Sequence, residues 1–195
     1  MAVAGTHASQ EQPSAWVARF ASLVPPGEVL DLACGGGRHA RLMASLGHAV
    51  LAVDCDAEAL KRAKGAGIST LQKDLEAADG QSPAWSFEAD RFAGIVVTNY
   101  LYRPLMKNLM HSLAPGGVLL YETFACGNER YGKPSNPDFL LRPGELIDVV
   151  GGIAAGARII AYEDGYVALP RPAMVQRICA RKEGGPLSDI DLRLN

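Results

Sequence analysis

The fold is decided by residues 29–40, which read Val29-Leu30-Asp31-Leu32-Ala33-Cys34-Gly35-Gly36-Gly37-Arg38-His39-Ala40. The apolar run at the start predicts a buried strand, and the residues after the glycines predict a helix. Glycine adopts positive φ and has no Cβ, so a ligand can lie directly against the backbone of this turn. A strand, a glycine-rich turn and a helix in this order predict the nucleotide-binding edge of an α/β protein.

Length and composition bound the class of protein. The 195 residues suit one domain, and we expect a flexible tail at 1–12, the domain at 13–183 and a second tail at 184–195. A net charge of −2 does not favour nucleic acid or a membrane surface as a partner. The sequence has no long apolar span, and the four cysteines form no C-x-x-C pair. The N-terminal residues lack a basic region followed by an apolar run, so we expect no signal peptide. We therefore expect a cytoplasmic protein with reduced thiols and no metal site.

Strand and helix patterns alternate along most of the chain. A helix at 13–24 is followed by strands at 28–32, 49–53, 68–72, 92–98 and 118–123, with helices at 37–46, 56–64 and 100–113 between them. This alternation predicts an open, mostly parallel sheet with helices on both faces. A short helix at 145–150 precedes two strands at 157–163 and 175–181, which predict an antiparallel hairpin at the sheet edge.

Residues 124–143 lack this periodicity. They hold glycine, proline, asparagine, basic residues and aromatics. A loop of this length within a compact domain is usually functional, so we expect a partly ordered lid.

Polar residues follow several of the predicted strands, at the edge where an open parallel sheet binds ligands. Asp54 can accept hydrogen bonds from the two hydroxyls of a ribose. Asp74 can accept a hydrogen bond from an adenine amino group, with Leu75 against the ring. Asn99 can contact the ligand through its side chain or its carbonyl. The alternatives are a helix cap for Asp54 or Asp56, a solvated loop acid for Asp74 and an Asx turn for Asn99.

Residues 35–40 also satisfy Gly-x-Gly-x-x-Ala, a dinucleotide-binding pattern that places a pyrophosphate at the start of the helix. The carboxylate of Asp31 would oppose a phosphate there and would suit a ligand with a cationic group. S-adenosylmethionine carries an ammonium, a sulfonium, a ribose diol and an adenine, so the charge argument favours it over NAD. The open functions are a methyltransferase, an NAD-dependent oxidoreductase and a cofactor-binding module without catalysis.

The same residues resemble a known family. Residues 30–37 are similar to the first motif of class I S-adenosylmethionine-dependent methyltransferases, acid-x-Gly-x-Gly-x-Gly, with Ala33 in place of the first glycine. Val53-Asp54 resembles the ribose-binding acid of that family, and Lys73-Asp74-Leu75 its adenine-contacting segment. Residues 92–99 and 113–119 resemble the later motifs, so the likeness covers residues 28–123. Short strings at 99–105, 127–129 and 139–146 are similar to the small bacterial methyltransferases of the tellurite-resistance type.

The resemblance implies a Rossmann-like, seven-stranded sheet and S-adenosylmethionine as cofactor, with S-adenosylhomocysteine as product. It implies that the cofactor is bound by Asp31, Ala33, Cys34, Gly35, Gly37, Arg38, Asp54, Cys55, Asp74, Leu75, Asn99 and Tyr100. We expect a small-molecule acceptor, such as a thiol or a chalcogen oxyanion, and a monomer or homodimer.

Methyl transfer from a sulfonium needs a general base only if the acceptor arrives protonated. The candidate catalytic residues are Tyr102 and Arg103, after the fourth strand, and Glu122, at the end of the fifth. His39 is a further candidate near the mouth of the cleft. Their alternative roles are a core aromatic for Tyr102, a solvated side chain or an ion pair with Glu122 or Glu129 for Arg103, and a helix-lining position for His39.

Overall fold

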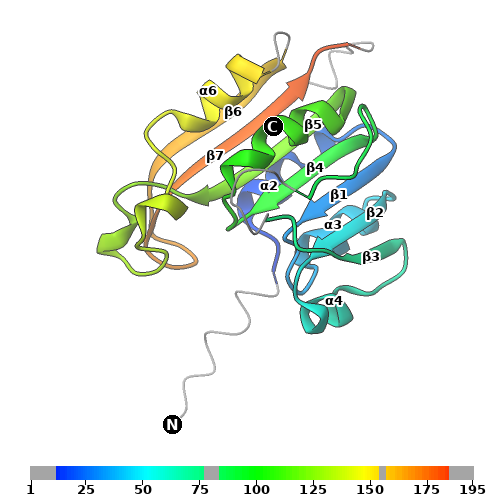
Figure 1. Cartoon of the computed structure of the whole chain (residues 1–195), viewed down its shortest axis with the longest axis horizontal. Coiled ribbons are helices and arrows are strands. Elements are labelled where there is room, and N and C mark those ends of the chain that lie inside the picture. Colours follow the sequence, from blue (N-terminus) through cyan, green and yellow to red (C-terminus); the bar gives the residue numbers. More distant parts are fainter. Residues whose placement is uncertain (1–11, 77–83, 154–156, 185–195) are drawn as a thin grey trace.

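Seven strands form one sheet, in the spatial order β3-β2-β1-β4-β5-β7-β6 (Figure 1). The computed structural model describes residues 12–76, 84–153 and 157–184, so nearly all of both predicted tails lies outside the described residues. The first five strands pair in parallel, and β7 runs antiparallel to both β5 and β6. The predicted α/β sheet with a C-terminal antiparallel hairpin is confirmed. The strands are β1 (Glu28–Leu32), β2 (Ala49–Asp54), β3 (Ile68–Gln72), β4 (Phe92–Thr98), β5 (Leu113–Phe124), β6 (Ala157–Val167) and β7 (Ala173–Lys182).

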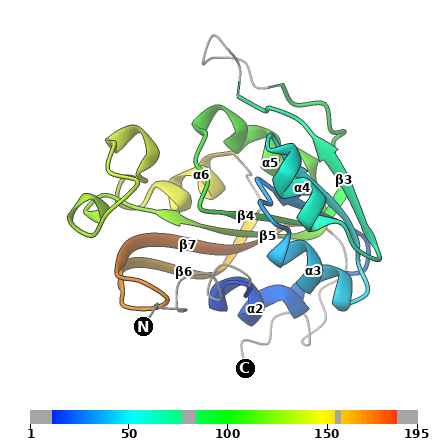
Figure 2. The ribbon, with the colours of Figure 1, turned by 90° about the horizontal axis from the view of Figure 1, so that it is seen from below.

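Helices cover both faces of the sheet, with α2 and α3 on one face and α5 and α6 on the other (Figure 2). The two largest of three core clusters follow this division: one includes Phe20 and Met43, and the other includes Met110 and Tyr121. None of the described helices is long and apolar enough to cross a bilayer. The helices are α2 (Ala15–Phe20), α3 (Arg38–Ser45), α4 (Ala57–Ala63), α5 (Met106–Ser112) and α6 (Glu145–Ile153), with 3-10 turns η1 (Ala21–Leu23), η2 (Arg103–Leu105), η3 (Asn128–Arg130) and η4 (Pro137–Phe139).

The glycine turn after β1 brings two helices close together. Gly37 has φ +77°, and a Cβ placed there would lie 2.6 Å from the Cβ of Ala63 in α4. Only glycine fits this contact, so Gly37 serves both the turn and the packing of α3 on α4. Ala33, at the position of the family's first glycine, adopts φ +51°, a left-handed conformation that costs an alanine roughly 1 kcal/mol.

The connection from β4 to α5 differs from the sequence prediction. A helix was expected from residue 100, but the chain forms the 3-10 turn η2 first and α5 begins at Met106. Asn99 adopts φ +55°, and Tyr102 is extended at φ −135°. Pro104 has no N–H and so occupies the first turn of η2, which leaves the preceding residues outside the helix.

Two other bounds needed correction. The strand predicted at 118–123 begins earlier, at Leu113, and includes Gly116 at φ +82°, where the pairing with β4 shifts between Phe92 and Gly94. The C-terminal hairpin is longer than predicted, and β7 lies inside the sheet between β5 and β6.

Residues 125–143 are held against the hairpin and against β5. The side chain of Asn128, which is 2% exposed, donates to the carbonyl of Pro134 at 2.9 Å and accepts from the N–H of Met174 at 3.2 Å. The N–H of Leu141 donates to the carbonyl of Phe124 at 2.9 Å. The segment expected to be a lid is therefore anchored near both of its ends, at Asn128 to the hairpin and at Leu141 to β5.

Candidate active site

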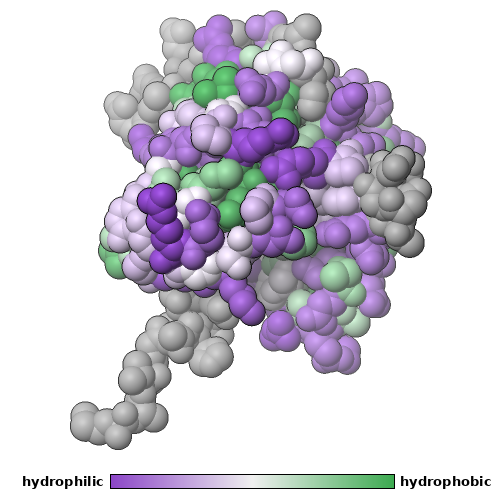
Figure 3. Space-filling view, turned by 60° about the vertical axis from the view of Figure 1, so that its left-hand side comes forward, coloured by the Kyte–Doolittle hydropathy of each residue, from purple (hydrophilic) through white to green (hydrophobic). Residues whose placement is uncertain are grey.

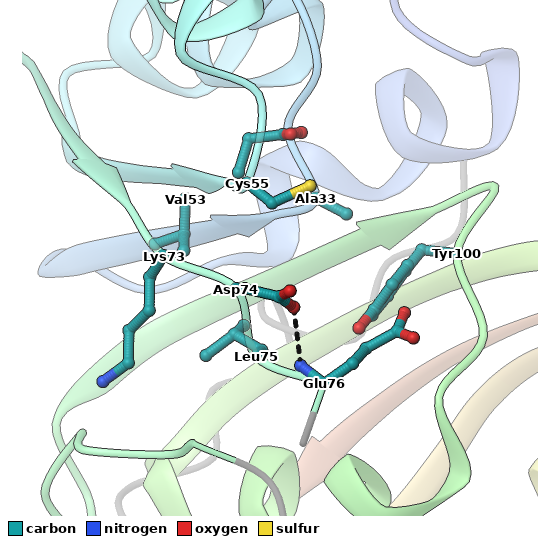
Figure 4. Close-up of a pocket in the computed structure, with 9 residues that line it drawn as sticks. Ala33, Val53, Cys55, Lys73, Asp74, Leu75, Glu76 and Tyr100 are labelled. Carbon is teal, nitrogen blue, oxygen red and sulfur yellow. Dashed lines mark hydrogen bonds between the residues drawn. The ribbon is translucent and has the colours of Figure 1, made fainter. Parts of the chain in front are cut away.

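A cavity of about 220 Å³ opens at the carboxyl ends of the first strands (Figure 4). The turn after β1, the end of β2, the segment after β3 and the loop after β4 form its walls. Six of the predicted cofactor-binding residues line it: Ala33, Asp54, Cys55, Asp74, Leu75 and Tyr100. Val53, Lys73 and Glu76 complete the lining.

Asp54 connects the end of β2 to the glycine turn. One carboxylate oxygen accepts from the N–H of Gly35 at 2.8 Å, and the other accepts from the N–H of Asp56 at 2.9 Å. A carboxylate has about four acceptor positions, so about two remain for the hydroxyls of a ribose. The neighbouring Asp56 caps α4 by accepting from the N–H of Glu58 at 2.8 Å, which confirms its predicted helix-capping role.

The opposite wall of the cavity carries two more acids. The carboxylate of Asp74 accepts from the N–H of Glu76 at 3.0 Å, a tight turn that brings the Glu76 side chain toward Tyr100 (Figure 4). Burial, together with Glu76 and Asp74, raises the pKa of the Tyr100 hydroxyl, which therefore stays protonated as a hydrogen-bond donor. The ammonium of Lys73 donates to the hydroxyl of Ser86 at 2.7 Å, away from the acids.

Gly35 leaves space beside the turn. It has φ +53°, and a Cβ placed there would meet no atom within 4 Å. The turn can therefore receive a ligand against its backbone, beside the carboxylate of Asp54. A backbone cradle, acids that can accept from a diol and an amino group, and the buried Leu75 together fit the adenosine part of S-adenosylmethionine.

Asp31 lies beneath the turn rather than on the wall of the cavity. Its side chain is 1% exposed, and one oxygen accepts from the N–H of Ala40 at 2.8 Å. Burial raises the pKa of this carboxyl to about 7, although the Ala40 N–H acts in the other direction. In this structure Asp31 caps the first turn of α3, and its contact with a cationic ligand stays a prediction.

Three other predicted cofactor residues do not line the cavity: two lie in or beside the turn, and the third follows β4. Cys34 is buried, and its thiol lies 3.5 Å from the carbonyl of Gly35. Arg38 is partly buried and donates to the carbonyl of Gln12 at 3.3 Å. The backbone N–H of the exposed Asn99 donates to the carbonyl of Glu122 at 2.9 Å.

The structure gives two of the three catalytic candidates other partners. The guanidinium of Arg103 forms an ion pair with Glu145 at 2.6 Å, and the carboxylate of Glu122 forms one with Arg177 at 2.7 Å. Burial raises the pKa of Glu122, while Arg177 acts to lower it. Tyr102 packs against the core cluster beside α5. None of the three lines the cavity, so the structure provides no support for a general base among them.

His39 serves the packing of α2. Its Nε2 accepts from the N–H of Ser14 at 3.1 Å, so Nδ1 carries the proton and faces the hydroxyl of Thr98 at 3.4 Å. Burial lowers the pKa of His39 to about 3, and the ring is neutral at physiological pH. Across the described parts of the chain, no three His, Cys, Asp or Glu side chains group closely enough to hold a metal ion.

Comparison with known proteins agrees with this geometry. Residues 29–117 match the family model described as a methyltransferase domain. No curated protein matches the chain. Several solved structures share the fold, and at identities below 25% their likeness establishes the fold alone.

Three solved structures illustrate the likeness. A SAM-dependent methyltransferase from Methanosarcina mazei is 16% identical, with a TM-score of 0.66, 89% of this chain covered and 100% of that chain. TehB from Haemophilus influenzae is 22% identical, with a TM-score of 0.67, 86% of this chain covered and 61% of that chain. An S-adenosylmethionine-dependent methyltransferase from Mesorhizobium loti is 19% identical, with a TM-score of 0.65, 87% of this chain covered and 98% of that chain.

Proposed function

We propose that the chain is an S-adenosylmethionine-dependent methyltransferase that transfers the cofactor's methyl group to a small-molecule acceptor. The match of residues 29–117 to a methyltransferase domain supports this proposal. The observation that supports this most strongly is the arrangement of Asp54 and Asp74 at neighbouring strand ends, beside the open backbone of Gly35. The two carboxylates can accept hydrogen bonds from the ribose diol and the adenine amino group of an adenosine, and the open backbone of Gly35 leaves room beside the ribose. The product is S-adenosylhomocysteine.

The glycine turn argues against the alternative of a dinucleotide cofactor. A pyrophosphate needs the free N–H groups of such a turn. Here the N–H of Gly35 donates to Asp54, so a carboxylate already occupies the place of a phosphate oxygen. The cavity contains three acids, and its one lysine is hydrogen-bonded to Ser86. The three acids make the electrostatic potential of the cavity negative, which favours a ligand with a cationic centre over one with two phosphates.

When bound, S-adenosylmethionine supplies an activated methyl group on a sulfonium that is already a good leaving group. The residues of the chain then act mainly by orientation. Asp54 holds the ribose, and Asp74 with Leu75 holds the adenine. Tyr100 forms the wall toward β4, where the acceptor approaches. Because Arg103 and Glu122 are committed to ion pairs, we expect an acceptor that reacts in its ionised form, such as a chalcogen oxyanion or a thiol that has already lost its proton to solvent.

A methyl-transfer screen tests this proposal. The protein is incubated with S-adenosylmethionine and one acceptor at a time from the thiol, chalcogen-oxyanion, carboxylate and phenol classes. S-adenosylhomocysteine is then quantified by mass spectrometry. We expect at least one ionised small nucleophile to raise product formation well above the rate without acceptor. Formation at the background rate with every acceptor, by a protein that binds the cofactor, would favour a non-catalytic binding module.

A further inference from the structure

Arg103 connects two segments that flank the site. Its guanidinium makes a two-point contact with Glu145, at 2.6 Å from Nε and 3.0 Å from Nη2. It also donates to the backbone carbonyls of Asp138, at 2.7 Å, and Leu140, at 2.8 Å. The planar fork of arginine suits this pattern, which a lysine cannot reproduce. One side chain after β4 thus holds the end of the loop that follows β5.

Glu145 is built to receive this contact. It is 8% exposed and begins α6, and it also accepts from the N–H of Arg142 at 2.8 Å. Burial acts to raise its pKa, but the hydrogen bonds from Arg103 and Arg142 outweigh burial and leave the pKa below its ordinary value. The carboxylate therefore stays ionised at neutral pH, and a buried charge of this kind is costly to separate from its partner.

A second contact, closer to the cavity, joins the segment after β4 to β5. Tyr121 in β5 donates its hydroxyl to the carbonyl of Tyr100 at 2.8 Å. Tyr100 lines the cavity and lies three residues before Arg103. Burial raises the pKa of the Tyr121 hydroxyl, and so does the charge of nearby Glu145, which places these groups in one neighbourhood. The segment after β4 is therefore joined to β5 through Tyr100 and to the loop after β5 through Arg103.

We propose that Arg103 is a positioning residue that locks residues 138–145 to the cavity wall at Tyr100, so that the loop forms a fixed side of the acceptor site. This assignment replaces the role of a lid expected from the sequence. Naming the acceptor side rests on the proposed function, whereas the lock itself is a property of the fold. In Figure 3, which brings this side of the molecule forward, hydrophilic residues surround smaller apolar areas.

Hydrogen exchange, read by mass spectrometry or NMR, tests the lock at both of its ends. On the loop, the amides of Leu140, Leu141 and Arg142 are hydrogen-bonded. On the cavity side, so are the amides of Asn99 and Leu105. In the ligand-free protein we expect Arg103→Lys to speed exchange at both ends by about tenfold or more, because the contacts to a buried charge are lost.

Two further variants keep the result interpretable. Glu145→Gln retains the shape of the side chain and one acceptor oxygen. It should speed exchange at the same two ends by a smaller factor, and it tests the proposal if Arg103→Lys does not fold. Arg130→Lys changes an exposed arginine of the same loop and should leave both ends at the wild-type rate. The proposal is overturned if exchange is unchanged in Arg103→Lys and Glu145→Gln, or if it changes on the loop alone.

Binding of S-adenosylhomocysteine tests whether Arg103 connects the loop to the cavity. If Arg103 acted on the loop alone, its substitution would not change how the loop responds to a ligand at Tyr100. Binding of S-adenosylhomocysteine against Tyr100 should slow hydrogen exchange at Leu141 and Arg142 in the wild type. In Arg103→Lys this protection by the ligand should disappear, while the affinity for the ligand stays within about threefold. Slower exchange of these two amides on ligand binding to Arg103→Lys would contradict the proposal. If the wild type does not bind this ligand at all, the proposed function fails, and the ligand-free comparison still decides the lock.

Discussion

Asp54 provides the sharpest single-residue prediction, namely that Asp54→Ala weakens the binding of S-adenosylhomocysteine by roughly 2 kcal/mol or more. The carboxylate faces the cavity with about two acceptor positions beyond those used by the N–H groups of Gly35 and Asp56. A pair of charge-assisted hydrogen bonds to the ribose accounts for this free energy. The loss corresponds to about 30-fold in Kd at 25 °C.

Isothermal titration calorimetry measures the affinity, and thermal unfolding shows that the variant is folded. Asp56→Ala is the matched control, because Asp56 caps α4 without lining the cavity. It should cost about 1 kcal/mol of unfolding free energy and leave the affinity unchanged. An affinity within threefold of wild type in a folded Asp54→Ala would remove Asp54 from the ribose site. An equal loss in Asp56→Ala would trace the effect to the start of α4 instead.

Two further predictions concern the glycine turn and the acid beneath it. The pKa of Asp31 is about 7 in the folded protein against an ordinary value of 3.8, so its stabilising contribution is fully present below about pH 4 and is lost as the pH rises through 7. Asp31→Asn should therefore gain unfolding free energy relative to wild type between pH 4 and 8, with a limit of about 4 kcal/mol, as measured by urea unfolding across that range. A difference that does not change with pH would show that the carboxyl is not perturbed. Gly37→Ala should destabilise the fold by about 2–4 kcal/mol, because it combines left-handed strain with a Cβ at 2.6 Å from Ala63. Gly35→Ala meets no atom within 4 Å, so it should cost only about 1 kcal/mol of stability but weaken S-adenosylhomocysteine binding. Equal stability of the two variants would refute this distinction.

The strands and the glycine turn could be predicted from sequence because their signals are local. The apolar run of β4 is buried at every position, as is typical of a parallel strand covered on both faces, and glycine or polar residues flank the runs. The start of α5 was misplaced because Pro104 is compatible with an α-helix and also with the 3-10 turn that the chain adopts. Glu76 was missed because only the hydrogen bond from its own N–H to Asp74 turns it into the cavity.

The roles of the charged candidates depended on partners that are distant in sequence. Arg103 and Glu122 lie at strand ends, where an acceptor would approach. In the folded chain, Arg103 forms an ion pair with Glu145, and Glu122 forms one with Arg177. Asp31 precedes the turn as the family motif requires, yet the returning α3 covers it and supplies an N–H to its carboxylate. Spacing alone predicts which residues gather at the carboxyl edge, whereas burial and pairing decide which of them face the ligand.

Calorimetric titration of the wild-type protein with S-adenosylhomocysteine, and in parallel with NADH, tests the central claim most directly. The acids of the cavity and the occupied N–H of Gly35 predict saturable binding of S-adenosylhomocysteine with one site per chain and no binding of NADH. Saturable binding of NADH together with no heat from S-adenosylhomocysteine would contradict the account.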